Sequence, residues 1–304
     1  MSEKTYGYYP GCSGTGTSLE YDRSTRAVCA ALGVKLIELP DWNCCGSSPA
    51  HNVDPCLSSA LAARNFAEAE KIGVNAVLTP CPSCLKNLHN ALEHMRDGKF
   101  KEEVDALTGR PLEHPHSISS VLQVITEEIT PEVIAGRIRN PLRGLKVVAY
   151  YGCLMTRPGR SMKFDHEENP TSIDRLMQAC GAEVLPFPLK TECCGASLAI
   201  PRADVVARLA GRILDLAGSV GADAVVVGCP LCQMNLDLRQ GQINSACNKN
   251  FKLPVFYYTQ LLGLALGLEP SKLGLNKLVV DPAIALAKIG RAADAKAENL
   301  EAVT

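Results

Sequence analysis

Cysteine is the residue type best able to do chemistry in this 304-residue chain, which has 14 of them. Ten form two matching sets, in which a single cysteine is followed by Cys-Cys-Gly and then by Cys-Pro-x-Cys. The first set is Cys12, Cys44, Cys45, Cys81 and Cys84, and the second is Cys153, Cys193, Cys194, Cys229 and Cys232. Thiolates are soft ligands for metals, and clustered thiols can also do redox chemistry. The two sets predict two metal or redox sites.

The rest of the composition narrows the class of protein. Lys and Arg number 31 against 32 Asp and Glu, so the charge gives no electrostatic footprint for nucleic acid or an anionic membrane. The N-terminus lacks the features of a signal peptide, and the longest apolar run, 261–268, is far shorter than the roughly 18–20 residues that span a bilayer. We expect a cytoplasmic protein that does not insert into a membrane. In the cytoplasm, thiols stay reduced.

An internal repeat organises the chain. Residues 32–40 before Cys44 resemble residues 180–188 before Cys193, and residues 72–80 before Cys81 resemble residues 220–228 before Cys229. A tandem duplication predicts a first domain at 1–140, which includes a connecting segment, a second domain at 141–270 and a C-terminal arm or tail at 271–304.

The segments between the cysteines predict the elements that position them. Short β-branched runs at 34–39, 74–79, 145–150, 182–187 and 222–227 are typical of buried strands. In 203–217, apolar residues recur every three or four positions and mark one face of a helix. Each half is predicted to be βαβαβα, so the fold class is α/β, with two tandem Rossmann-like domains that have parallel sheets.

This architecture brings the cysteines together. Loops after parallel strands emerge at one edge of the sheet, and each cysteine group follows a strand. Pro82 and Pro230 suit the first turn of a helix, which makes Cys81 and Cys229 candidate N-caps. We expect five sulfur atoms to converge in each half, with Gly46 and Gly195 providing the turns between adjacent cysteines.

The number of ligands bears on the metal. Zinc takes four ligands in a closed structural site, which leaves one cysteine over in each half. Iron–sulfur clusters are held by thiolates and tolerate Cys-Pro pairings. Spacing alone favours iron–sulfur sites over zinc, with reactive dithiols or simple packing as further alternatives.

The two sets resemble the paired CCG motifs of the B subunit of heterodisulfide reductase. The likeness runs from about residue 5 to residue 268 and includes the Tyr-Tyr-Thr-Gln-Leu-Leu-Gly-Leu-Ala segment at 257–265. All ten motif cysteines are present, although the 39 residues between Cys153 and Cys193 are at the long end of the pattern.

The resemblance implies a cofactor more firmly than a substrate. It implies that each set of five cysteines binds a noncubane [4Fe-4S] cluster and that a disulfide between the two clusters is cleaved or formed. The implied partners are the ferredoxin-like and the flavin-containing subunits of such a complex, and a small thiol, disulfide or sulfur-carrier substrate. Related proteins include sulfur-oxidising complexes and quinone-linked fumarate reductases, so an electron-transfer module is the alternative function, and a zinc scaffold is a third.

Two iron sites also suit the reaction on chemical grounds. Reducing a disulfide takes two electrons and produces two thiolates, each a soft ligand. We therefore predict that the halves pack with pseudo-twofold symmetry and that their cysteine edges face each other.

Other residues support weaker hypotheses. Arg157 and Arg160 follow Cys153 and could bind an anionic group of a thiol substrate, or they could be solvent-exposed loop residues. His51 could donate a proton to a departing thiolate, or it could be a hydrogen-bonded structural residue. Four cysteines outside the sets are expected to pack in the core: Cys29, Cys56, Cys180 and Cys247.

Overall fold

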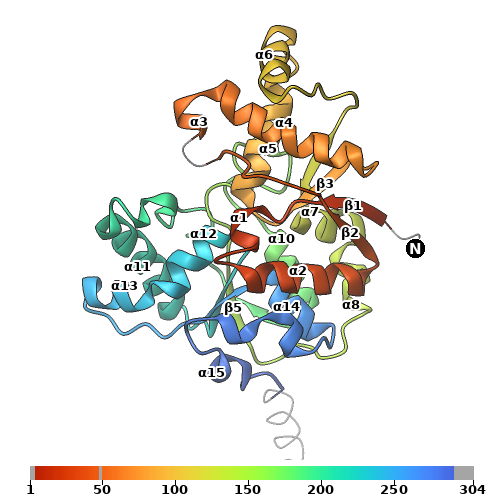
Figure 1. Cartoon of the computed structure of the whole chain (residues 1–304). Helices are drawn as coiled ribbons and strands as arrows, with labels where there is room; N and C mark the ends of the chain where they lie inside the picture. Colours follow the sequence, from red (N-terminus) through yellow and green to blue (C-terminus); the bar gives the residue numbers. More distant parts are fainter. Residues whose placement is uncertain (1–3, 48–49, 291–304) are drawn as a thin grey trace, which may run out of the picture.

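The computed structural model describes residues 4–47 and 50–290, in which eight strands form two four-stranded parallel sheets (Figure 1). The first sheet has the order β2-β1-β3-β4 and contains β1 (Lys4–Tyr8), β2 (Val34–Glu38), β3 (Ala76–Thr79) and β4 (Ser117–Ser120). The second has the equivalent order β6-β5-β7-β8 and contains β5 (Lys146–Tyr150), β6 (Glu183–Val184), β7 (Ala224–Val227) and β8 (Val255–Tyr257). The α/β class and the duplication are confirmed.

Each sheet has one strand more than the three in the predicted βαβαβα pattern. β4 pairs with β3, and β8 pairs with β7, in both cases in parallel. β4 precedes α7 (Val121–Gln123) and the π-helical η1 (Val124–Ile129), and β8 precedes α14 (Tyr258–Ala265). These strands are only four and three residues long, so their pattern is too short to distinguish from the helix that follows.

The helices lie on both sides of the sheets. The other helices of the first half are α1 (Gly11–Gly14), α2 (Leu19–Leu32), α3 (Ala50–Val53), α4 (Pro55–Lys71), α5 (Pro82–His94), α6 (Gly98–Thr108) and α8 (Pro131–Ala135). Those of the second half are α9 (Gly159–Met162), α10 (Ser172–Ala179), η2 (Ala196–Ala199), α11 (Ala203–Ser219), α12 (Pro230–Gln233), the π-helical η3 (Met234–Leu238) and α13 (Gln240–Cys247). The proposed domain boundary at residue 140 falls between α8 and β5.

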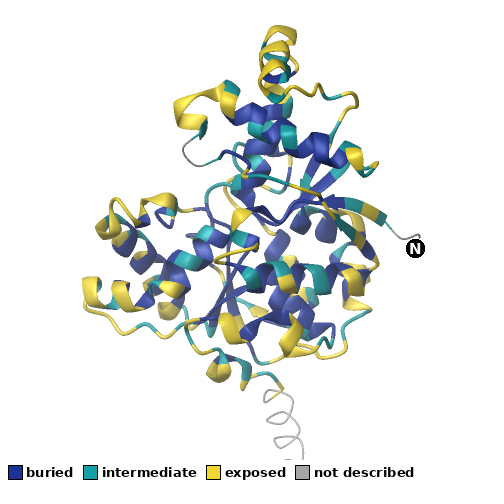
Figure 2. Ribbon diagram, in the orientation of Figure 1, coloured by how far each residue is buried: buried dark blue, intermediate teal, exposed yellow. Residues whose placement is uncertain are grey.

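The hydrophobic core is divided unequally between the halves. A large cluster contains the second sheet together with α2, η1 and α8 of the first half. A smaller cluster contains side chains from α4, α5 and α6. Figure 2 shows the second sheet largely as buried ribbon and α2 as partly buried, whereas α6 has a mostly exposed surface. The first half therefore contributes to two cores: the larger contains most of the second half, and the smaller includes only Met162 of α9 from that half.

Aromatic and hydroxyl side chains join α2 to the β8–α14 segment. The Tyr21 ring stacks on the Tyr257 ring with centroids 4.0 Å apart and an interplanar angle of 5°. The hydroxyl groups of Ser24 and Thr259 are 2.7 Å apart. All four residues are buried, so this contact between the halves is part of the core.

After α14 the chain forms η4 (Pro270–Leu273), η5 (Leu275–Lys277) and α15 (Ala283–Leu286). Gln260 Nε2 donates to the Leu273 carbonyl at 3.1 Å, which holds η4 against α14. The predicted arm therefore begins as a packed segment, and its last part, 291–304, lies outside the described residues. Within the described ranges, none of the helices has the length and apolar character needed to cross a bilayer.

Candidate functional site

The ten motif cysteines follow the C-terminal ends of three strands in each half. They come after β1, β2 and β3 in the first half and after β5, β6 and β7 in the second. The Sγ atoms of Cys45 and Cys84 are 3.3 Å apart, and those of Cys194 and Cys232 are 3.7 Å apart. The topology thus brings together sulfur atoms from different loops, as expected for parallel strands.

The Cys-Pro-x-Cys segments begin helices. Cys81 is the N-cap of α5 and Cys229 is the N-cap of α12, each with proline in the first helical turn, as predicted. Hydrogen bonding from Cys84, together with the backbone N–H groups of Cys84 and Ser83, lowers the pKa of the Cys81 thiol although burial opposes this. A helix N-terminus therefore favours a thiolate at this position.

The glycine of each Cys-Cys-Gly motif has a left-handed backbone, with φ of 83° at Gly46 and 95° at Gly195. In each case its N–H group points to the first cysteine of the motif, at 3.5 Å from Cys44 Sγ and 3.3 Å from Cys193 Sγ. This conformation suits glycine because it lacks a Cβ atom. The predicted turns are confirmed.

A second pair of glycines, which the sequence analysis missed, lies beside the sulfur atoms. Gly11 and Gly152 have φ of +70° and +69°, and each precedes the first cysteine of its set. A Cβ atom at Gly11 would be 3.1 Å from Cys84 Sγ, and one at Gly152 would be 2.8 Å from Cys232 Sγ. Both positions need glycine for its conformation and for the space beside the sulfur.

A tyrosine in each half supports the Cys-Cys-Gly loop from behind. Tyr9 donates from its hydroxyl to the Asn43 carbonyl at 2.8 Å, and Tyr150 donates to the Glu192 carbonyl at 2.7 Å. Each acceptor is the residue just before its Cys-Cys pair. Burial raises the pKa of both phenols far above the usual range, and negative charge on the nearby cysteines adds to this effect.

An asparagine three residues after each Cys-Pro-x-Cys motif was also missed. The Asn87 amide donates to the Cys45 carbonyl and to Ser58 Oγ, and the Asn235 amide donates to the Cys194 carbonyl at 3.3 Å. Asn235 Nδ2 is also 3.5 Å from Cys194 Sγ. These tyrosines, glycines and asparagines recur in both halves beside the same motifs, so their recurrence was a signal available in the sequence.

The adjacent cysteines differ in exposure and acidity. Cys44 and Cys193 are exposed, whereas Cys45 and Cys194 are buried. Hydrogen bonding from Cys44 and then Cys84 lowers the pKa of Cys45, and hydrogen bonding from Cys232 lowers the pKa of Cys194 to about 6. The lowered pKa of the buried member of each pair therefore favours the thiolate, which is the form that binds metals.

The donor set suits an iron–sulfur group. Among the described residues, no three His, Cys, Asp or Glu side chains are arranged to hold a single metal ion. Soft sulfur donors nevertheless come from three loops in each half, and Gly11 and Gly152 leave the side of Cys84 and Cys232 free of any Cβ atom. The residues present thus fit a group that is larger than one ion and is bound by thiolates.

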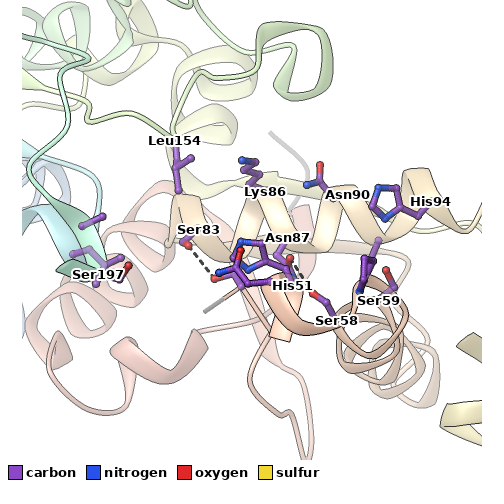
Figure 3. Close-up of a pocket in the computed structure, with 16 residues that line it drawn as sticks. His51, Ser58, Ser59, Ser83, Lys86, Asn87, Asn90, His94, Leu154 and Ser197 are labelled. Atoms are coloured by element: carbon purple, nitrogen blue, oxygen red, sulfur yellow. Dashed lines mark hydrogen bonds between the residues drawn. The ribbon is translucent and has the colours of Figure 1, made fainter. Parts of the chain in front are cut away.

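The loops that carry the cysteines meet at a cavity of about 650 Å³ between the halves. From the first half, Ser47 and Ser83 line it, and from the second half Leu154 and Leu231 line it. Ser83 and Leu231 lie within the Cys-Pro-x-Cys motifs. Leu154 follows Cys153 directly, and Ser47 is two residues after Cys45. Figure 3 shows Ser83 on α5 with Leu154 and Ser197 on the side of the second half. Residues of the cysteine loops of both halves therefore border the same space, although none of the motif cysteines is among the residues that line it.

The cavity has an unequal lining. Polar and basic side chains from the first half include His51, Lys86, Asn90 and His94, whereas the second half adds Leu154, Ala196, Ser197 and Leu231. Lys86 and Asn90 project from the same side of α5 in Figure 3. Lys86 has no ion-pair partner among the described residues.

The weaker candidates have different positions. His51 is exposed and lines the cavity, and its proton-donor role stays a prediction. The Arg157 guanidinium bonds to Glu168, to the Glu167 carbonyl and to Thr191, and the residue does not line this cavity. The side chain of Arg160 lies outside what the structure describes.

Two of the four remaining cysteines are fully packed. Cys29 and Cys180 are 1% and 0% exposed, and burial raises the pKa of each thiol to about 12. Cys247 is partly buried with its Sγ 3.6 Å from the Ala207 carbonyl. Cys56 lies in the first turn of α4 and is also partly buried. None of these thiols has a described contact with the motif cysteines.

The fold and the paired sites define a duplicated α/β protein with a cysteine-rich loop edge in each half. The CCG family, described as a cysteine-rich domain, matches residues 6–89 and 147–237. The chain belongs to this family and contains two copies of its domain.

Two relatives cover nearly the whole chain. The chain is 34% identical over 282 residues to the 8-methylmenaquinol:fumarate reductase membrane anchor subunit of Wolinella succinogenes, covering 92% of this chain and 98% of that protein. It is 31% identical over 278 residues to the B subunit of the ferredoxin:CoB-CoM heterodisulfide reductase of Methanosarcina mazei, covering 88% and 91%. The resemblance to the B subunit of heterodisulfide reductase is confirmed.

A solved structure shares the fold. A hypothetical protein from Helicobacter pylori superposes with a TM-score of 0.74 at 14% sequence identity. The match covers 92% of this chain and 52% of that chain. At this identity the likeness concerns the fold alone.

Proposed function

We propose that this protein is an iron–sulfur subunit of an oxidoreductase complex and that it cleaves or forms a disulfide between two noncubane [4Fe-4S] clusters. The observation that carries the proposal is the cavity bordered by both cysteine loops. Its relatives in heterodisulfide reductases support the reaction class.

In this proposal the ten motif cysteines hold the clusters, five in each half. The clusters would supply electrons and iron sites that accept sulfur. The chain's own residues position the cysteine loops. Tyr9 and Tyr150 donate hydrogen bonds to the Cys-Cys-Gly loops, and Asn87 and Asn235 donate to the carbonyl groups of Cys45 and Cys194. Buried hydrogen bonds of this kind fix ligand positions before the cofactor binds.

The first half would bind the polar part of the substrate. Lys86 and His94 project from α5 into the cavity, where the Lys86 ammonium group can pair with an anionic group. His51 borders the same cavity and would donate a proton to a released thiolate. The small and apolar side chains of the second half would contact a less polar part.

The partners in the proposal are the ferredoxin-like and the flavin-containing subunits of a heterodisulfide-reductase-like complex, which would lie in the cytoplasm. The substrate would be a small disulfide or thiol, or sulfur on a carrier. A second candidate is an electron-transfer, quinone-linked module, and the relative from Wolinella succinogenes specifically favours it. That relative is named as a membrane anchor, which suggests that such a module would meet the membrane through its complex.

Metal analysis and spectroscopy test the proposal. Protein purified without oxygen should contain about eight irons and no stoichiometric zinc, and Cys45→Ser should lose iron while the core variant Cys29→Ser keeps it. Electron paramagnetic resonance (EPR) spectra should then change when a thiol or disulfide is added. An iron-free, zinc-containing protein would contradict the proposal, and full iron with no response to any thiol would favour the electron-transfer module.

A further inference from the structure

A buried phenol lies where the two Cys-Pro-x-Cys loops meet. Tyr257 is the last residue of β8 and pairs in register with Val227, two residues before Cys229. Its ring stacks on Tyr21, whose hydroxyl lies 3.2 Å from the Pro80 carbonyl and 3.1 Å from the Gly228 carbonyl. Those carbonyl groups immediately precede Cys81 and Cys229, so the stacked pair is adjacent to both motifs.

The Tyr257 hydroxyl is fully buried and has no hydrogen-bond partner among the described residues. The buried Ser18 hydroxyl lies close enough to interact with it, which opposes the rise in the pKa of Tyr257, although the two oxygen atoms are not at hydrogen-bond distance. Burial is the main reason that the pKa of Tyr257 is raised far above its usual range, and negative charge on Glu20, followed by Cys229 and Cys81, adds to this effect. A buried hydroxyl without a partner at hydrogen-bond distance therefore lies on the strand that pairs with the residues leading to Cys229. Buried donors in native proteins are nearly always satisfied, so this one calls for a partner.

The equivalent position in the first half cannot play the same part. In β4, Ser120 pairs with Thr79, just as Tyr257 pairs with Val227 in the second half. The Ser120 side chain accepts a hydrogen bond from the Gln123 N–H group at 2.9 Å and so caps α7. Of these two equivalent positions, only the one in the second half has a phenol.

We propose that Tyr257 is a positioning residue that donates its hydroxyl hydrogen bond to the sulfur of Cys229 when the second site is loaded, so that the second cluster has a higher reduction potential than it would without this bond. This inference rests on the proposed function, because it requires clusters on the motif cysteines. A hydrogen bond to a ligand sulfur stabilises the more negatively charged, reduced form of a cluster. The register of β8 beside β7 favours Cys229 over Cys81 as the acceptor.

Tyr257→Phe and Tyr258→Phe form a matched pair of variants. Tyr258 is the next residue, is equally buried, and its hydroxyl also lacks a hydrogen-bond partner at bonding distance. Burial raises the pKa of Tyr258, its interaction with Tyr21 opposes this rise, and charge on Cys29, which is not a motif cysteine, adds to it. Each substitution removes one oxygen atom from the same aromatic layer, so general effects on packing should be alike.

The test is a redox titration of the anaerobically purified protein followed by EPR, with iron content and thermal unfolding measured on the same samples. In Tyr257→Phe, one cluster signal should shift to lower potential and the other should stay, with full iron content. Tyr258→Phe should match the wild type. Equal shifts in both variants, or no shift in Tyr257→Phe, would overturn the inference alone. A wild-type protein that binds no iron would overturn the proposed function and the inference together.

Discussion

The two cysteine sites have the same support but different surroundings. In both halves a left-handed glycine, a tyrosine and an asparagine fix the loops that carry the sulfur atoms. The helix after the second motif differs: α5 runs regularly from Pro82 to His94, whereas α12 has four residues and continues as the π-helical η3. The residues that support the cysteine loops are therefore the same in the two halves, whereas the residues that line the cavity differ.

This contrast separates two kinds of residue. Those that position the sulfur atoms should have equivalent effects in both halves when they are changed. Those that line the cavity should act in one half only. The predictions below test this division, from the largest expected effect to the smallest.

Alanine at Gly152 or Gly11 should have the largest effect. The new Cβ would crowd Cys232 or Cys84, and the left-handed backbone adds a cost of roughly 1–2 kcal/mol. We expect each variant to lose about half of the iron expected for two clusters, with the greater instability in Gly152→Ala because its contact would be closer.

Iron and sulfide analysis with thermal unfolding would measure this. Gly218→Ala is the control, since a Cβ there meets no atom within 4 Å and φ is not positive. If both site variants retained full iron, the glycines would not be needed to shape the sites.

Alanine at Asn87 or Asn235 should lower stability in both halves. Each change leaves a buried carbonyl group without its donor, which costs about 1–3 kcal/mol. Only Asn235→Ala should also alter a cluster signal in EPR, because only that amide contacts a sulfur atom.

Denaturant unfolding and EPR on the same samples would measure both effects. Asn90→Ala removes an amide that lines the cavity from the same helix, α5, and should leave the stability near that of the wild type. A matching EPR change in Asn87→Ala would show that the two amides act alike.

Lys86→Met should affect substrate binding in one half. Methionine is the residue at the equivalent position of the repeat, Met234, so the variant gives the first site the side chain of the second. Losing a charged hydrogen bond of about 1.4 kcal/mol would raise the KM for an anionic disulfide roughly tenfold.

Steady-state kinetics with the reconstituted complex would compare 3,3′-dithiodipropionate with the neutral 2-hydroxyethyl disulfide. The KM for the neutral compound should not change, and Lys99→Met on α6 should leave both values unchanged. An equal rise for both disulfides would argue against charge recognition by Lys86.

The smallest effect concerns pH and a pair of equivalent positions, His89 and Asp237. Burial raises the pKa of Asp237 to about 6. Its contribution to the free energy of unfolding is therefore complete below the pKa of the unfolded state, which is about 4, and is lost as the pH rises through 6. Burial lowers the pKa of His89 below 6.5, so its contribution is lost as pH falls through the folded value.

Melting temperatures of cluster-free protein between pH 4.5 and 7.5 would reveal the two trends. Asp237→Asn should flatten the decline toward pH 7, and His89→Gln should flatten the decline toward low pH. If the melting temperatures of the two variants changed with pH in the same way, the two residues would not have opposite effects on the pH dependence of stability.

The sequence predicted the cysteine sets, the duplication and the α/β class because repeated motifs and β-branched runs are local signals. It did not predict β4 and β8, because four or three residues carry too little periodic pattern. Tyr9 and Asn87 act through contacts with residues 34 and 42 positions away, and their equivalents Tyr150 and Asn235 through contacts 42 and 41 positions away. Such contacts depend on the packed fold. The cavity lining likewise joins residues from both halves, so no single segment predicts it.

The hydroxyl group of Tyr21 connects the two loops that carry the Cys-Pro-x-Cys motifs. It lies within hydrogen-bond distance of one carbonyl from each half, next to each Cys-Pro-x-Cys motif. Because the group is buried, the halves cannot separate or close without disrupting contacts that water does not replace. These contacts favour one width of the gap between the two loops, and we expect molecules that bridge it to be selected by length.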